Sequence, residues 1–152
     1  MADNAEAVAP QLSLQRIFLK DLSFESPRSP VVFQEEWKPE VGLELNTKSR
    51  QVGENAYEVV LELTINVKNN GEAAFLIQVQ QGGLFAIAGL DEKQLHHALG
   101  AFCPGTLFPY ARENVDALCV KGSFPALMLA PVNFDALYVE SLKNQQAEAT
   151  EQ

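Results

Sequence analysis

A long alternation of apolar and polar residues in the middle of the chain constrains the fold more than any other feature. From Tyr57 to Val67 every second residue is apolar, and the residues between them are Glu58, Val60, Glu62, Thr64 and Asn66. Successive side chains of a strand point to opposite faces of a sheet, so one face of this segment is apolar and the other is mostly polar. The segment therefore predicts a half-buried strand of unusual length.

Turn signals and further strands surround this segment. Residues 69–71, Asn-Asn-Gly, supply the positive-φ positions of a tight turn, and residues 51–55 mark the turn before the long strand. Residues 14–25 predict the first strand, with a bulge as an open alternative. The strands on either side of the long one carry same-face apolar residues, Val41, Leu43 and Leu45 before it and Phe75, Ile77 and Val79 after it. Four strands joined mostly by short turns predict an antiparallel meander.

The periodicity becomes helical after Gly89. Residues 90–99 predict a first helical piece, and Pro104 and Pro109 are expected to break or kink any helix that passes through them. A second helix ends at Gly122, and one of its faces holds Leu107, Ala111, Val115 and Leu118. An apolar loop follows, and Asn133 is a good N-cap for a last helix. The apolar stripe of that helix is Phe134, Leu137, Tyr138 and Leu142.

This order of elements predicts an α+β domain with its helices on one face of a four-stranded antiparallel sheet. The domain is expected to span residues 12–142. Residues 1–11 and 143–152 are polar and aperiodic, so both are expected to be mobile tails. The sheet face away from the helices would mix apolar Val60, Leu76 and Leu19 with polar Thr64 and Gln78, a pattern that favours self-association.

Composition narrows the possible locations and partners. The chain has 152 residues, of which 47% are hydrophobic, as in one globular domain. It has no apolar run of the ~20 residues that a membrane span requires, and residues 1–11 lack the cationic and apolar regions of a secretory signal. A cytoplasmic protein is therefore expected. The net charge of −9 disfavours nucleic acid and anionic membranes as partners.

Few residues offer chemistry. His96, His97 and Cys103 form the one cluster that suggests metal binding or thiol catalysis, yet adjacent histidines on a helix point about 100° apart and cannot share an ion. Cys103 and Cys119 are expected to remain thiols. We therefore predict no metal, no cofactor and no catalysis, with a small enzyme using Cys103 and a histidine as the alternative. Gly82-Gly83 predicts a bulge or sharp twist at the end of the fourth strand.

Several uncommon sequence segments recur in order along the chain. They are dense in aromatic, aliphatic and proline residues toward the C-terminus. The segments are residues 15–17 (Gln-Arg-Ile), 20–25 (Lys-Asp-Leu-Ser-Phe-Glu), 32–39 (Val-Phe-Gln-Glu-Glu-Trp-Lys-Pro), 80–83 (Gln-Gln-Gly-Gly), 107–113, 124–127 and 131–137. Together they resemble the SecB family of bacterial protein-export chaperones, over roughly residues 12–142.

The resemblance implies a tetramer built as a dimer of dimers. It implies a holdase that works without ATP, which binds unfolded precursor proteins, keeps them competent for translocation and delivers them to the motor ATPase SecA. A related branch of the family serves a stress-responsive toxin–antitoxin system, and that function is the alternative.

Aromatic residues are the candidates for client binding. Phe33 and Trp37 lie in a proline-flanked segment, residues 29–40, which is more loop than strand. Phe134 and Tyr138 lie on one face of the last helix, and Phe24 ends the first strand. A loop folded over a helix with aromatic side chains on both sides would form a groove for extended peptide.

Acidic residues of the first strand are the candidates for SecA binding. Asp21 and Glu25 project to the same face of that strand, and the resemblance places acidic contacts for SecA at these positions. They would attract the basic, zinc-containing tail of SecA. Leu76 and Gln78 occupy two other positions of the family's patch. Gln78 stands where the family commonly has glutamate, which removes one negative charge.

Overall fold

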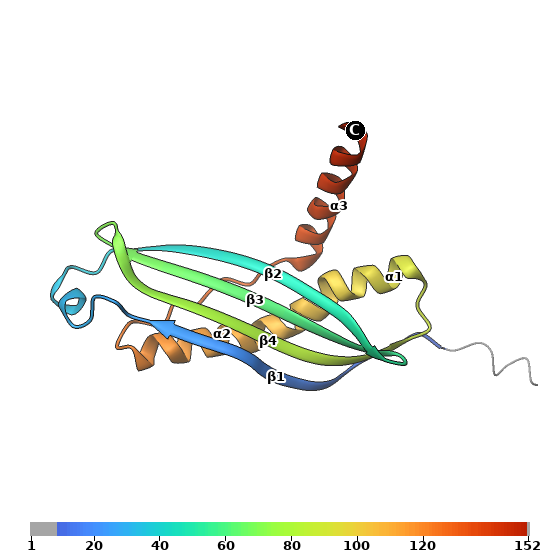
Figure 1. Cartoon of the computed structure of the whole chain (residues 1–152), viewed down its shortest axis with the longest axis horizontal. Helices are drawn as coiled ribbons and strands as arrows, with labels where there is room; N and C mark the ends of the chain where they lie inside the picture. The colour runs from blue at the N-terminus through green and yellow to red at the C-terminus, as the bar shows by residue number, and fades with distance from the viewer. Residues whose placement is uncertain (1–8, 152) are drawn as a thin grey trace, which may run out of the picture.

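The computed structural model describes residues 9–151 and has two layers (Figure 1). Its elements are β1 (Gln11–Glu25), the 3-10 helix η2 (Val31–Gln34), β2 (Pro39–Gly53), β3 (Ala56–Asn69), β4 (Glu72–Ala88), α1 (Glu92–His97), the π-helix η3 (Ala98–Phe102), α2 (Cys103–Lys121) and α3 (Phe134–Glu151). The sheet is one layer and the continuous run α1–η3–α2 is the other, whereas α3 projects away from the sheet. The predicted α+β class is confirmed. We call the helix side of the sheet the inner face and the opposite side the outer face.

The sheet is antiparallel with the strand order β1-β4-β3-β2. Tight hairpins join β2 to β3 and β3 to β4, and the second hairpin has the expected positive φ at Asn70 (57°) and Gly71 (77°). The prediction of a meander is wrong for β1, which pairs with β4 rather than with β2. The chain between β1 and β2, residues 26–38, is a crossover segment and carries the chain to the other edge of the sheet.

The core lies between the inner face of the sheet and α2. The inner-facing residues of β3 are buried as the alternation predicts: Val59, Leu61, Leu63, Ile65 and Val67 are each at most 1% exposed. From α2, Leu107, Ala111, Val115 and Cys119 are fully buried, and Leu118 packs half-buried at the margin. The predicted strand faces and helix face are therefore confirmed, with Cys119 in the place expected for Leu118.

The helix passes through both prolines. The backbone N–H of Cys103 donates to the carbonyl of Ala98, so one π turn stands directly before Pro104. Pro104 lies directly after this π turn, at the start of α2, and Pro109 lies inside α2. Of the expected break or kink, the break is wrong: the helical run continues through both prolines, and the irregularity at Pro104 is one π turn.

Gly82 and Gly83 lie within β4 and do not form the predicted bulge at its end. Their role is close packing on both faces of the sheet. A Cβ at Gly82 would overlap the ring of Phe18, and a Cβ at Gly83 would lie 2.8 Å from Leu107 Cδ2. The irregular strand is β1, whose pairing with β4 shifts register at two places, after Leu14 and after Leu19. The bulge left open for the first strand is thereby confirmed.

The C-terminal helix begins as predicted and runs further. The Asn133 side chain accepts a hydrogen bond from the backbone N–H of Ala136 (3.0 Å), which makes it the N-cap. The helix continues to Glu151, so residues 143–151 are helical rather than irregular. At the other end β1 already begins at Gln11, and residues 1–8 of the expected N-terminal tail lie outside the described part of the chain. The mobility of both tails stays a prediction.

Candidate binding surfaces

Three of the predicted client-binding residues meet in one aromatic cluster around Phe124. The ring centroid of Phe124 lies 5.2 Å from that of Phe33, 5.4 Å from that of Trp37 and 4.5 Å from that of Phe75. Phe24 joins from β1, 5.8 Å from Phe75. Phe75 and Phe124 are buried, Phe24 and Trp37 are half-buried, and Phe33 is 46% exposed. We call these five residues the Phe124 cluster; it has a buried floor and an accessible rim.

Phe124 and Phe75 were not among the residues predicted to bind clients. The alternation of β4 assigned Phe75 to the core, which is correct, and Phe124 stands in a loop that has no periodicity. The signal that could have found Phe124 is the apolar character of the loop after Gly122. Such a loop must lie against something, and here it lies against the aromatic side chains of the crossover segment.

Polar contacts tie the crossover segment to the turn between β3 and β4. Arg28 donates to Glu35 Oε2 (2.7 Å), to the carbonyl of Asn69 (3.1 Å) and to the carbonyl of Ala73 (3.2 Å). The fully buried Asn69 donates to Glu35 Oε1 (3.0 Å) and accepts from the backbone N–H of Lys38 (2.8 Å). We call Arg28, Glu35 and Asn69 the latch. It fixes the segment that presents Phe33 and Trp37.

Phe134 and Tyr138 form a second, separate site. Phe134 is 8% exposed and packs edge-to-face on Phe108, with the ring centroids 5.9 Å apart. Both residues line a groove of about 340 Å³ between β2 and α3, together with Leu45, Thr47 and Leu137 among others. Among the described residues, no ring contact joins this group to the Phe124 cluster. Within a single chain, the crossover loop and the last helix therefore do not form the one groove that was predicted. The crossover segment lies near the C-terminal end of α2, away from the part of the helical layer that α3 contacts (Figure 1).

The histidines pair with α3 and not with a cysteine. His96 Nδ1 is hydrogen-bonded to the Tyr138 hydroxyl, and His97 Nε2 lies 2.7 Å from Asp135 Oδ1. Cys103 is fully buried, and this burial raises the pKa of its thiol to about 12. Burial also raises the pKa of the Cys119 thiol. Both thiols are protonated near neutral pH and are poor nucleophiles.

No group of three or more histidine, cysteine, aspartate or glutamate side chains in residues 9–151 could hold a metal ion. The histidine and cysteine side chains that suggested such a site each have another structural role, in docking α3 or in the core.

The four residues predicted to contact SecA share one strip of the outer face. In the register of β1 and β4, Asp21 lies opposite Gln80 and Glu25 lies opposite Leu76, with Gln78 between these positions. Asp21, Glu25 and Gln78 are exposed and Leu76 is half-buried. The register therefore places all four residues on one face, and their role stays a prediction. Leu19 was expected on this face but lies opposite Gln81, on the inner face, because a bulge follows it.

A family model described as SecB, preprotein translocase subunit SecB, matches residues 5–145. The chain belongs to the SecB family. Among its relatives, the protein-export protein SecB of Marinomonas sp. (strain MWYL1) is 80% identical over 142 residues, which are 93% of this chain and 89% of the relative. The protein-export protein SecB of Hahella chejuensis (strain KCTC 2396) is 62% identical over 149 residues, 97% of this chain and 94% of the relative.

A solved structure shares the SecB fold with this chain. It is a SecB-like chaperone of Mycobacterium tuberculosis in complex with a peptide from the HigA1 antitoxin, with a TM-score of 0.68 and 20% identity, covering 80% of this chain and 90% of that one. At this identity the match shows the fold alone. The close relatives are SecB proteins of protein export, and they favour the export function over the toxin–antitoxin alternative. No helix in the described part of this chain is long and apolar enough to cross a membrane.

Proposed function

We propose that this SecB-family chain is a cytoplasmic, ATP-independent holdase for protein export. It binds unfolded precursor proteins, keeps them from aggregating and delivers them to SecA. The observation that carries this proposal is the Phe124 cluster, an aromatic surface with a buried floor and an exposed rim at Phe33. Such a surface can bury the apolar side chains of an extended peptide, each worth ~1.5–3 kcal/mol when fully desolvated.

Low specificity follows from the same chemistry. Aromatic faces accept aliphatic and aromatic side chains alike, so the cluster would select unfolded chains by exposed apolar residues rather than by sequence. The groove at Phe134 and Tyr138 would hold a second part of a long client. Binding alone accounts for this function, and no nucleotide, cofactor or covalent step enters it.

Delivery to SecA is assigned to the strip of Asp21, Glu25, Leu76 and Gln78. Two exposed carboxylates beside a half-buried leucine suit a basic tail that is held by salt-sensitive ion pairs. Gln78 contributes no charge, so the contact is expected to be weaker than one with a glutamate there.

Charge reversal of this strip tests the assignment. We expect Asp21→Lys with Glu25→Lys to lose SecA binding at low salt and to retain client binding, because the strip and the Phe124 cluster lie on opposite faces of the sheet. Glu54→Lys with Glu148→Lys changes the net charge equally at exposed sites elsewhere and is the control. Titration calorimetry with purified SecA measures both pairs. If the Asp21/Glu25 variant and the parent bind SecA with equal affinity, the strip is not the SecA contact.

A further inference from the structure

Charges on the outer face of the sheet are sorted by sign along the strands. Paired residues of adjacent strands lie side by side on the same face, so the register arranges the outer face in rows across the sheet. The row nearest the crossover end pairs Glu40 with Lys68, one charge of each sign. The five rows that follow it are Glu25-Leu76-Asn66-Gly42, then Ser23-Gln78-Thr64-Glu44, then Asp21-Gln80-Glu62-Asn46, then Phe18-Gly82-Val60-Lys48, and then Arg16-Leu84-Glu58-Arg50.

The first three of these five rows form an acidic half and the last two form a basic half, while the Glu40–Lys68 row adds no net charge at the acidic end. The acidic half holds Glu25, Glu44, Asp21 and Glu62. The basic half holds Lys48, Arg16 and Arg50, and Lys20 reaches into it from the bulge of β1 to contact Glu58. The acidic half therefore carries four negative charges, and the basic half carries four positive charges and one negative charge. A net positive region is unexpected on a chain whose net charge is −9.

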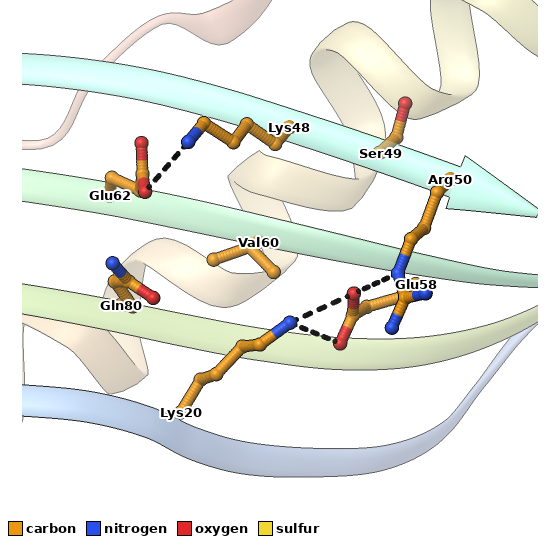
Figure 2. Close-up of a pocket in the computed structure, with 8 residues that line it drawn as sticks. All are labelled: Lys20, Lys48, Ser49, Arg50, Glu58, Val60, Glu62 and Gln80. Carbon is orange, nitrogen blue, oxygen red and sulfur yellow. Dashed lines mark hydrogen bonds and ion pairs between the residues drawn. The ribbon is translucent and has the colours of Figure 1, made fainter.

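The basic half is hollowed rather than flat (Figure 2). Three of its cations, Lys20, Lys48 and Arg50, line an open cavity of about 500 Å³ above Val60. Lys20 and Arg50 reach Glu58 from the two edge strands, at 3.0 Å and 2.8 Å, and only 12% of the Glu58 side chain is exposed. Their hydrogen bonds, that of Arg50 first, lower the pKa of Glu58, so this carboxylate stays charged and orients both cations.

Of the three cations that line the cavity, Arg50 and Lys48 are the most open to solvent. The side chains of Arg50 and Lys48 are 68% and 67% exposed. Arg50 engages Glu58 through Nε, and Lys48 has a 3.4 Å contact with Glu62 at the boundary between the halves. The terminal nitrogens of Arg50 and the ammonium of Lys48 can therefore receive further carboxylates, and a guanidinium is well suited to them.

We propose that the basic half binds an acidic segment of the same export partner whose basic segment docks on the acidic half. This inference rests on the proposed function, since it takes the acidic half as the SecA contact. The partner chain would thus be bipolar, with a basic stretch and an acidic stretch that lie on the sheet in one orientation. Reversing the chain would place like charges together, so the face selects direction as well as charge.

The spacing of the rows sets the length of such a segment. Residues two apart on a strand are separated by about 6.6–6.8 Å, so the first and last of the five rows lie about 27 Å apart. An extended chain covers that distance with about eight residues. The centres of the two charged stretches would be about five residues apart.

A second copy of this chain is the competing occupant, because a two-fold axis could also place an acidic half on a basic half. Stable self-association surfaces are rich in apolar side chains at their centre. Here the central outer-face apolar residue, Val60, is 5% exposed and lies beneath the charged side chains. The charged outer face suits a transient and salt-sensitive contact instead.

Labelled synthetic peptides test the proposal with the full-length protein. The probes are a four-lysine block, a four-glutamate block, and the two blocks joined by a Gly/Ser spacer, measured by fluorescence anisotropy at low salt. We expect the glutamate block to bind in spite of the protein's negative charge, and the joined peptide to bind at least about tenfold tighter than either block. Arg16→Glu with Lys48→Glu should abolish binding of the glutamate block and leave the lysine block bound.

The control pair is Lys121→Glu with Lys143→Glu, which makes the same change in net charge at exposed positions of α2 and α3. If the double variant folds poorly, the single substitution Lys48→Gln, at an exposed side chain, replaces it in the test. We expect Lys48→Gln to weaken binding of the glutamate block several-fold. Equal binding of the glutamate block by the parent, Lys48→Gln and the Arg16/Lys48 variant would overturn the inference.

Two further outcomes separate this inference from its alternatives. If the glutamate block binds and the lysine block does not, the basic half is supported and the SecA assignment of the acidic half fails. If light scattering shows an association of the parent that the Arg16/Lys48 variant loses, and the parent binds no glutamate block, the face joins two copies of this chain and the proposal is overturned.

Discussion

Trp37 is positioned to report on the Phe124 cluster. Its ring is nearly parallel to that of Phe75, at 6.4 Å and 12°, and its centroid lies 5.4 Å from that of Phe124. The side chain is half-buried, which places it between the buried floor and the exposed Phe33. It is also the chain's one tryptophan, so its fluorescence comes from this surface alone.

We expect an unfolded apolar peptide to shift the emission of Trp37. We expect Trp37→Ala to fold but to bind such a peptide about tenfold or more weakly, and Trp37→Phe to recover most of the affinity. A fully buried aromatic would cost ~3–5 kcal/mol on truncation to alanine, and a half-buried ring should cost less. Peptide titration and urea unfolding measure the two effects. If the Trp37 emission does not change when peptide is added, and Trp37→Ala is severely destabilised, the ring belongs to the core.

The sequence identified individual client-binding candidates better than it identified their neighbours. Phe33 and Trp37 stood out because they are aromatic in a proline-flanked loop. Their common partner Phe124 comes from a loop far along the chain, and no periodicity connects them. The contact depends on where the crossover segment docks, which is a tertiary property.

At the scale of elements, the latch decides how the crossover segment is held. Hydrogen bonds from Arg28, and then from Asn69, lower the pKa of Glu35 below the ordinary value for glutamate. A carboxylate with a lowered pKa in the folded state stabilises that state above the ordinary pKa. This stabilisation is lost as the pH falls through the lowered pKa. The segment should therefore stay docked at neutral pH and loosen only in acid.

Glu35→Gln should reproduce the loosened segment at neutral pH. It keeps the shape of the side chain and removes the charge that Arg28 contacts at 2.7 Å. We expect client affinity to fall several-fold and the acid transition in Trp37 emission to diminish. Glu36→Gln is the matched control, because that side chain is exposed and the latch uses only the Glu36 backbone carbonyl. If the two variants have the same affinity and the same pH profile, the latch does not position the client surface.

Element prediction from the sequence succeeded where periodicity is strong and failed where packing decides. The β2–β3–β4 hairpins and the inner face of β3 follow from alternation and turn residues. The pairing of β1 with β4 does not follow from them, because the local sequence does not determine which edge of the sheet a crossover segment reaches. The path of the helix through Pro104 depends on one π turn, and the extension of α3 to Glu151 follows no apolar stripe.

For the whole molecule, apolar side chains at the edges of the sheet favour assembly. Helix α2 covers the central strands β3 and β4, while inner-face residues of the edge strands remain accessible. Leu19 and Leu22 of β1 are 44% and 37% exposed, and Val41 and Leu43 of β2 are 47% and 37% exposed. Apolar surface of this kind next to unpaired strand edges invites a partner chain.

We expect a homotetramer, a dimer of dimers with a mass about four times 16.7 kDa. Multi-angle light scattering at micromolar concentration measures it. A stable dimer would support only the first level of assembly, and a monomer would contradict the proposal. Leu22→Glu should lower the mass by placing a charge on the apolar margin of β1, whereas Glu25→Gln, on the outer face of the same strand, should leave the mass unchanged.

The central claim is that this chain protects unfolded precursors by binding alone. The most direct test follows the aggregation of a chemically unfolded preprotein by light scattering after dilution into buffer with the purified chaperone. We expect stoichiometric protein to suppress aggregation without ATP, added ATP to change nothing, and Trp37→Ala to protect less at the same concentration. Aggregation that is as fast with excess chaperone as without it, or protection that requires ATP, would contradict the account.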